Sequence, residues 1–170
     1  MNPLVSLFLS VLAVIVTIIA AIVYYSDNSG NLSASNYYQD QASIQASMES
    51  VYGAQGWPAE TLSPQEQLSI VPAGWVKNPN AANPVIQTES GGDVVITVFA
   101  GAGFSLATDN VDSKSCVRIL SRSGVQTGIQ YFWVGPSIPA ALASTALTPP
   151  VANAATYCTS PRNAIVSFAK

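Results

Sequence analysis

The sequence opens with a long apolar segment that carries no charge. Residues 4–25 read LVSLFLSVLAVIVTIIAAIVYY, and the first charged side chain of the chain is Asp27. As a helix this segment would be about 33 Å long, which is enough to cross the hydrocarbon core of a bilayer. Asn2 and Pro3 suit its start, because Asn caps helices well and Pro fits the first helical position. The sequence therefore predicts an apolar helix over residues 1–25 that inserts into a membrane.

Three other roles for this segment have to be weighed. A cleaved secretory signal has a basic start and a shorter apolar stretch, whereas this segment has no Lys or Arg before or within it. A buried helix of a soluble domain would need covering on every side, which a domain of this size rarely achieves. An ordinary single-span membrane anchor is the third alternative, and the sequence leaves it open.

The charge and the residue types argue against several classes of function. Only 9% of the residues are charged and the net charge is -3, whereas a nucleic-acid interface needs clustered Lys and Arg. The sequence contains no histidine, so Ser–His–Asp and Cys–His catalytic groups cannot form. It has neither the Cys spacing of a zinc site nor a phosphate-binding P-loop. We expect a protein that is not an enzyme and uses no cofactor or metal.

Some acidic residues and tryptophans are of types that bind ligands in other proteins, but a structural role is the simpler explanation for them. Asp109 and Asp112 could touch a cation, although such acids more often cap helices. Trp57, Trp75 and Trp133 could form a sugar-binding platform, but core or subunit contacts are favoured for them.

The residues after the apolar segment divide the chain further. Residues 26–31 (Ser-Asp-Asn-Ser-Gly-Asn) are helix breakers and predict a flexible or melted linker. Apolar residues then recur at helical spacing up to Gly53, which predicts an amphipathic helix over 32–53. The stripe on its core-facing side consists of Tyr37, Ile44, Met48, Val51 and Tyr52. This helix opens a globular head that comprises residues 32–170.

The head is predicted to be α+β, with an antiparallel sheet packed against the amphipathic helix. Ser63 to Glu66 form a capping box with Pro64 at the first helical position. The remaining predicted elements are a hairpin of strands 94–99 and 104–108, a short helix that Asp112 caps and Gly124 stops, strands 129–134 and 164–168, and a long surface loop over 135–156.

Cys116 and Cys158 are the only cysteines. Their spacing is not that of a C-x-x-C redox motif. In an exported protein a structural disulfide is the expected state, because oxidising compartments favour it. Closing this loop would stabilise the head by about 4 kcal/mol on the chain-entropy model. Free buried thiols are the alternative.

Taken in order, these features resemble mature type IV pilins, and among them the type IVb pilins of conjugative thin pili and toxin-coregulated pili. The resemblance covers nearly the whole chain, and it depends on the order of motifs that are each weak alone. The motifs are the apolar start without a leader, the amphipathic continuation at 48–53, the capped helix at 63–72, the Asn83-Pro84 and Gly91-Gly92 elements, the 94–108 hairpin and the two cysteines.

The resemblance implies a major structural subunit of an extracellular type IV pilus that serves adhesion, aggregation or conjugative contact. The family is processed by a prepilin peptidase, which would leave Met1 as an N-methylated first residue. The subunit would wait in the inner membrane of a Gram-negative cell, and an assembly machine would then add it to a helical homopolymer. Cys116 and Cys158 would bound the exposed variable region of the head. The implied assembly residues are Met1, Asn2, Pro3, Val5, Ser6, Phe8, Val14 and Ala20.

Val5 departs from the family pattern. The family usually has Glu at this place, where it pairs with the N-terminal amine of a neighbouring subunit. A buried charge without a partner is costly, so the amine of Met1 needs another acceptor, and oxygens of Asn2 or Ser6 or a water molecule are candidates. This departure keeps two alternatives open, a minor pilin and a type II secretion pseudopilin. A monomeric membrane-anchored binding domain is a further alternative.

Overall fold

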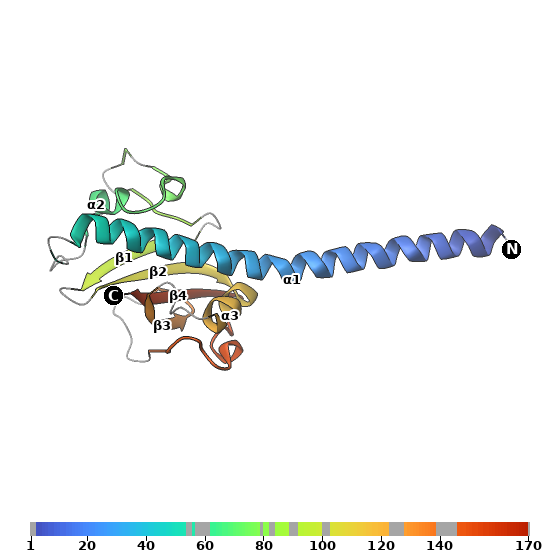
Figure 1. The fold of residues 1–170 in the computed structure, drawn as a ribbon. Coiled ribbons are helices and arrows are strands. Elements are labelled where there is room, and N and C mark those ends of the chain that lie inside the picture. The colour runs from blue at the N-terminus through green and yellow to red at the C-terminus, as the bar shows by residue number, and fades with distance from the viewer. Residues whose placement is uncertain are drawn as a thin grey trace.

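A computed structural model of the chain describes residues 3–53, 56, 62–78, 80–81, 84–88, 92–99, 103–122, 128–138 and 146–169, apart from the side chains of 3–10, 26–32 and 64. In chain order the elements are α1 (Pro3–Tyr52), α2 (Pro64–Leu68), the 3-10 helix η1 (Ala73–Trp75), β1 (Val94–Phe99), β2 (Gly103–Asp112), α3 (Ser113–Ser121), β3 (Ile129–Gly135), the 3-10 helix η3 (Ala154–Thr156) and β4 (Arg162–Ala169). Figure 1 shows one end of α1 lying along a compact head and the other end projecting away from it.

The long helix α1 is continuous, and this corrects one expectation. We expected residues 26–31 to interrupt or weaken it, but the helix runs without a break from Pro3 to Tyr52. The energetic cost of Ser, Asp, Asn and Gly inside a helix is at most about 1 kcal/mol per residue, and the long helical segments on both sides outweigh it. Because these residues are helix breakers, we still predict that 26–31 unwind locally inside a filament.

The second half of α1 packs on the head through one narrow stripe. Its buried residues are Ala34, Tyr37, Gln41, Ile44 and Met48, which follow one another at alternating spacings of three and four as one face of a helix requires. Tyr37, Ile44 and Met48 were predicted from the sequence and are confirmed. Val51 was placed in the same stripe wrongly, since 42% of it is exposed. Tyr52, which was also predicted in the stripe, packs against the core as a partly buried residue.

The four strands form one antiparallel sheet in the order β1-β2-β4-β3. The C-terminal strand β4 thus lies between β2 and β3, so the last residues of the chain complete the core. One apolar cluster joins α1 to the 62–76 segment and to β1 and β2. A second cluster joins α1 to α3, β3 and the disulfide. The predicted α+β class, with a long helix packed on an antiparallel sheet, is confirmed.

Several local predictions are also confirmed. Ser63 and Glu66 form the reciprocal capping box at the start of α2. The hairpin joins β1 to β2 with Val94 opposite Thr108. The turn was expected at residues 101–103, but Gly103 begins β2. Residues 101 and 102 and the expected helix stop at Gly124 lie outside the described residues.

Two predicted boundaries were wrong. β2 does not end at Thr108, because it continues to Asp112 across a register shift between Thr108 and Val111. Residues 135–156 are not simply a surface loop. Leu147 forms a bridge with Phe132, the Val151 N–H donates to the Leu120 carbonyl at 2.8 Å, and η3 follows. The described part of this segment is thus tied to β3 and α3.

Candidate functional site

The first half of α1 presents an apolar surface on all sides. The large aliphatic side chains from Val11 to Val23 are 45–62% exposed, and Tyr24 and Tyr25 follow them at higher exposure. Successive residues point in different directions around a helix, so a run in which each one is exposed has no face packed on the head. Figure 1 shows this part of α1 extending beyond the head. We call residues 11–25 the free apolar segment.

The Thr17 hydroxyl in the middle of this segment is satisfied within the helix. Thr17 Oγ1 donates to the carbonyl oxygen of Val14 at 2.8 Å, which is the usual solution for a hydroxyl in an apolar helix. The segment can therefore enter an apolar environment without stranding this hydroxyl. Within the part of the chain whose residues the structure describes, no helix has the length and apolar character needed to cross a membrane. The membrane insertion of residues 1–25 stays a prediction.

The structure locates only some of the predicted assembly residues. Val14 and Ala20 are exposed on the free apolar segment. Pro3 begins α1, and the backbone at Val5, Ser6 and Phe8 is helical. The side chains of these four residues lie outside the described part of the chain, as do Met1 and Asn2 altogether. Their roles in assembly stay predictions.

Apart from the free apolar segment, the second region of interest lies in the head, around the disulfide. Cys116 and Cys158 are joined, as predicted, with their Cα atoms 5.9 Å apart. Both are buried among residues of the second apolar cluster. The bond connects α3 to the segment just before β4. Because the two cysteines are 42 positions apart in sequence, the bond closes the whole region that contains β3 and the 146–158 segment.

The helix α3 is held at both ends. At its start Asp112 accepts hydrogen bonds from the backbone of Lys114 and Ser115, at 3.0 and 3.1 Å, and from Ser115 Oγ. Burial by itself would raise the pKa of Asp112, but the bonds from Ser115 and Lys114 and the nearby Arg162 charge together lower it.

At the other end of α3, Tyr38 of α1 donates towards the carbonyl oxygens of Ile119 and Arg122. These carbonyls belong to the last turn, which lacks intrahelical partners. Burial raises the pKa of Tyr38, and the Arg122 charge partly opposes this. The phenol therefore remains a neutral donor that ties α3 to α1.

The comparisons with known proteins agree with this architecture. Neither the protein-family models nor the curated proteins give a match to the sequence. Among solved structures, the crystal structure of a type IV b pilin from Salmonella typhi is similar. It has a TM-score of 0.53 and 16% identity, and the match covers 76% of this chain and 95% of that chain. The chain thus has the fold of a type IV pilin, as its motifs suggested.

Sequence reasoning missed the polar residues of the α1–sheet interface. Gln41 is completely buried, and its Oε1 accepts from Ser167 Oγ at 2.8 Å. A signal was present, because Gln41 lies midway between Tyr37 and Ile44 in the helical stripe. A pattern that counts apolar residues alone does not select a Gln at this place.

Proposed function

We propose that this chain is a structural subunit of a type IV pilus and that it polymerises through the free apolar segment. The observation that carries this proposal is the exposure of each large aliphatic side chain from Val11 to Val23 on a helix that extends beyond the head. The pilin fold supports it, since the similar structure is that of a type IV b pilin.

The physical argument concerns where such a segment can be stable. Burying a Val, Leu or Ile side chain contributes about 1.5–3 kcal/mol, so a run of these residues in water is strongly unfavourable. Lipid tails and a bundle of similar helices are both suitable surroundings, and transfer between them costs little hydrophobic free energy because both are apolar. Packing between neighbouring helices then decides which is preferred. A subunit with such a segment can wait in a membrane and later move into a bundle.

The geometry also suits a filament. The free apolar segment and the head are different surfaces, and repeated head-to-tail contacts between different surfaces give open helical assemblies when they do not close into a ring. In this arrangement the apolar segments form the centre and the heads form the wall. The precursor resides in the inner membrane with its head on the oxidising side, and the Cys116–Cys158 disulfide is consistent with that compartment.

The finer role is part of the same proposal. We infer a major subunit of an extracellular pilus that serves adhesion, aggregation or conjugative contact, with other copies of itself and the assembly machinery as partners. Val5 is the feature that favours the second candidate, a minor pilin or pseudopilin, because Glu is usual at that place in the family.

Electron microscopy of material sheared from producing cells, with mass spectrometry of its components, tests both candidates. Long uniform filaments made chiefly of this chain support the major-subunit proposal. Filaments that hold only traces of this chain would favour the minor-subunit candidate. Short assemblies that stay in the periplasm would favour the pseudopilin, and a chain that never polymerises would contradict both.

A further inference from the structure

The helix α3 and its C-terminal cap carry basic residues on one face. Lys114, Arg118 and Arg122 follow one another at intervals of four, and all three are exposed. Residues at this spacing are neighbours on the same side of a helix. The other side of α3 packs on the head through buried residues such as Cys116 and Ile119. We call the three bases the basic ridge, which holds half of the six Lys and Arg residues of the chain.

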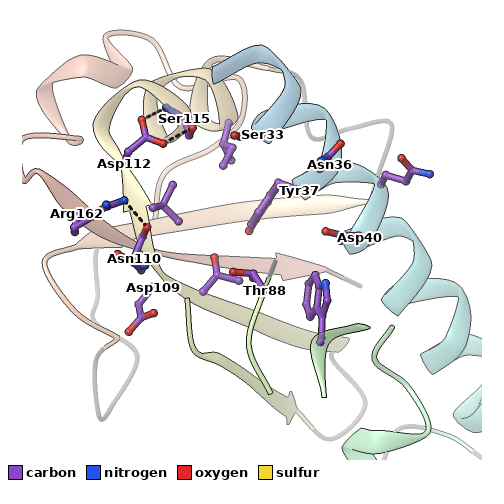
Figure 2. Close-up of a pocket in the computed structure, with 15 residues that line it drawn as sticks. Ser33, Asn36, Tyr37, Asp40, Thr88, Asp109, Asn110, Asp112, Ser115 and Arg162 are labelled. Atoms are coloured by element: carbon purple, nitrogen blue, oxygen red, sulfur yellow. Dashed lines mark hydrogen bonds between the residues drawn. The ribbon is translucent and has the colours of Figure 1, made fainter. Parts of the chain in front are cut away.

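The basic ridge lies at the end of the head from which the free apolar segment extends. Figure 1 shows α3 beside the point where α1 leaves the head. Figure 2 shows Ser33 of α1 next to the start of α3, where Asp112 accepts a hydrogen bond from Ser115. Ala34 of α1 is buried in the same apolar cluster as residues of α3. The rise from Tyr25 to Ala34 is about 13 Å along a helix.

This distance places the basic ridge within electrostatic range of a membrane that holds the free apolar segment. Tyr24 and Tyr25 end that segment, and aromatic residues of this kind favour the boundary between lipid and water. The headgroup layer on each side of a bilayer is about 5–7 Å thick, and screening at physiological salt acts over about 8 Å. These two lengths together match the rise from Tyr25 to α3. Negative headgroups would therefore attract the ridge.

The acids near the basic ridge do not share its face. Asp112 caps the start of α3, and the nearby Arg162 charge helps to lower the pKa of its carboxyl, so these two charges largely offset each other. Asp27 and Asp40 belong to α1 and supply opposing charges along that helix. The ridge itself gathers three positive charges on one exposed face, which suits an extended anionic surface better than a single anion.

We propose that the basic ridge contacts the anionic phospholipid headgroups of the membrane in which the subunit waits for assembly. This inference rests on the proposed function, because it requires the free apolar segment to be inserted. Each Lys or Arg near an anionic membrane surface strengthens association roughly five-fold. The contact holds the head against the bilayer, and it ends when the subunit moves into a filament. An acidic surface on a second copy is the competing partner, and the position of the ridge beside the inserted segment favours lipid.

The test compares two exposed lysines of the same molecule. The full chain is placed in nanodiscs of phosphatidylcholine alone or of phosphatidylcholine mixed with phosphatidylglycerol, and mass spectrometry measures how fast each lysine is acetylated. Lys114 belongs to the ridge, whereas Lys77 is exposed in the segment that follows η1. Relative to Lys77, acetylation of Lys114 should slow about five-fold or more when phosphatidylglycerol is present. High salt should remove the difference, because it screens the attraction.

Two variants show whether the charge of the ridge is responsible. Arg118→Gln/Arg122→Gln should remove the protection of Lys114, because the loss of two bases weakens the contact roughly 25-fold. Arg118→Lys/Arg122→Lys keeps both charges and should keep the protection. Thermal unfolding of both variants checks that the head is folded. Protection that survives the glutamine changes would overturn the inference.

The remaining outcomes separate this inference from the proposed function. A chain that enters neither kind of nanodisc would contradict the membrane insertion, and the ridge contact with it. A chain that enters both, with Lys114 equally reactive in both, would overturn the ridge contact alone. Protection of Lys114 in detergent micelles that increases with protein concentration would also overturn it, since the ridge would then contact a second copy.

Discussion

Ser167 on β4 and Gln41 on α1 are joined by a hydrogen bond of 2.8 Å, although they lie 126 residues apart in sequence. Both residues are completely buried. Most of the surrounding helix–sheet contact is apolar and would tolerate small shifts of α1 along the sheet. This bond favours one position, because moving α1 by a turn would leave the buried Gln41 Oε1 without its donor, whereas Ser167 Oγ also reaches the Leu106 carbonyl at 3.3 Å. Gln41 and Ser167 therefore help to set where the helix lies on the head.

Replacing Ser167 with Ala should destabilise the head by about 1–3 kcal/mol, because Gln41 Oε1 would lose its donor in a buried place. Adding Gln41→Leu should recover part of that loss, since the orphaned amide is then removed. Urea unfolding of the two single variants and the double variant measures this coupling. Strictly additive effects would mean that the bond contributes nothing specific.

The disulfide makes a second prediction. The double variant Cys116→Ser/Cys158→Ser should lower the free energy of unfolding by about 4 kcal/mol, because the unfolded chain regains the freedom of a long loop. The yield of assembled subunit should fall as well. Reducing agent should lower the Tm of the parent protein and leave that of the double variant unchanged. Equal Tm values for the parent and the double variant without reductant would show that the bond is dispensable.

Asp112 provides a prediction for pH. Its pKa is lowered from the usual 3.8 in the folded protein, so its ionised form favours folding. That contribution is present above pH 3.8 and is lost as the pH falls through the lower, folded-state pKa. Asp112→Ala should cost about 0.5–2 kcal/mol at neutral pH through the lost helix cap. The difference in stability from the parent should shrink below pH 3.8, and a difference that grew on acidification would contradict the assignment.

Much of the fold could be predicted from local chemistry. Capping residues marked the starts of α2 and α3 correctly, because each cap depends on side chains within four residues, such as Ser63 with Glu66, whereas α2 ends at Leu68 and not at the expected residue 72. The continuity of α1 could not be read in the same way. A local count of helix breakers at 26–31 overlooks the two long helical segments that extend to Pro3 and Tyr52.

The position of Gly92 depends on a contact that no local pattern reveals. A Cβ atom at Gly92 would lie 2.2 Å from the carbonyl oxygen of Asp109, which is a backbone atom and cannot rotate away. Gly92→Ala should therefore push β2 at its bulge and destabilise the head by about 1–3 kcal/mol. Gly74→Ala is the matched control, because a Cβ there meets nothing within 4 Å. Thermal unfolding of both variants decides the point, and equal Tm values would contradict the close approach.

The free apolar segment and the polar contact between helix and sheet differ in how well the sequence predicts them. The free apolar segment was evident from residues 4–25, since an uncharged run has few possible environments. The polar contact between Gln41 of α1 and Ser167 of β4 was not evident, because it joins residues 126 positions apart in sequence, and such pairings have no local signature.

The free apolar segment gives the sharpest test of assembly. Val14→Asp places a carboxylate in the middle of this segment, and a charge at the centre of an apolar helix costs roughly 2.5–3.5 kcal/mol on insertion scales. The same charge would meet no partner inside a bundle of identical helices. We expect this variant to be poorly inserted and to yield no filaments, as measured by shearing and quantitative immunoblotting.

Val85→Asp is the control for this experiment. Val85 is an exposed valine of the head, and Val14 is an exposed valine of the free apolar segment. Both substitutions introduce the same charge, but only one does so where apolar helices would pack. Filament yield should be close to parental for Val85→Asp and absent for Val14→Asp, while the full-length subunits of both variants, purified in detergent, unfold at the parental Tm. Parental filament yield from Val14→Asp would show that residues 11–25 are not buried in the assembly, and the proposed mode of polymerisation would have to be abandoned.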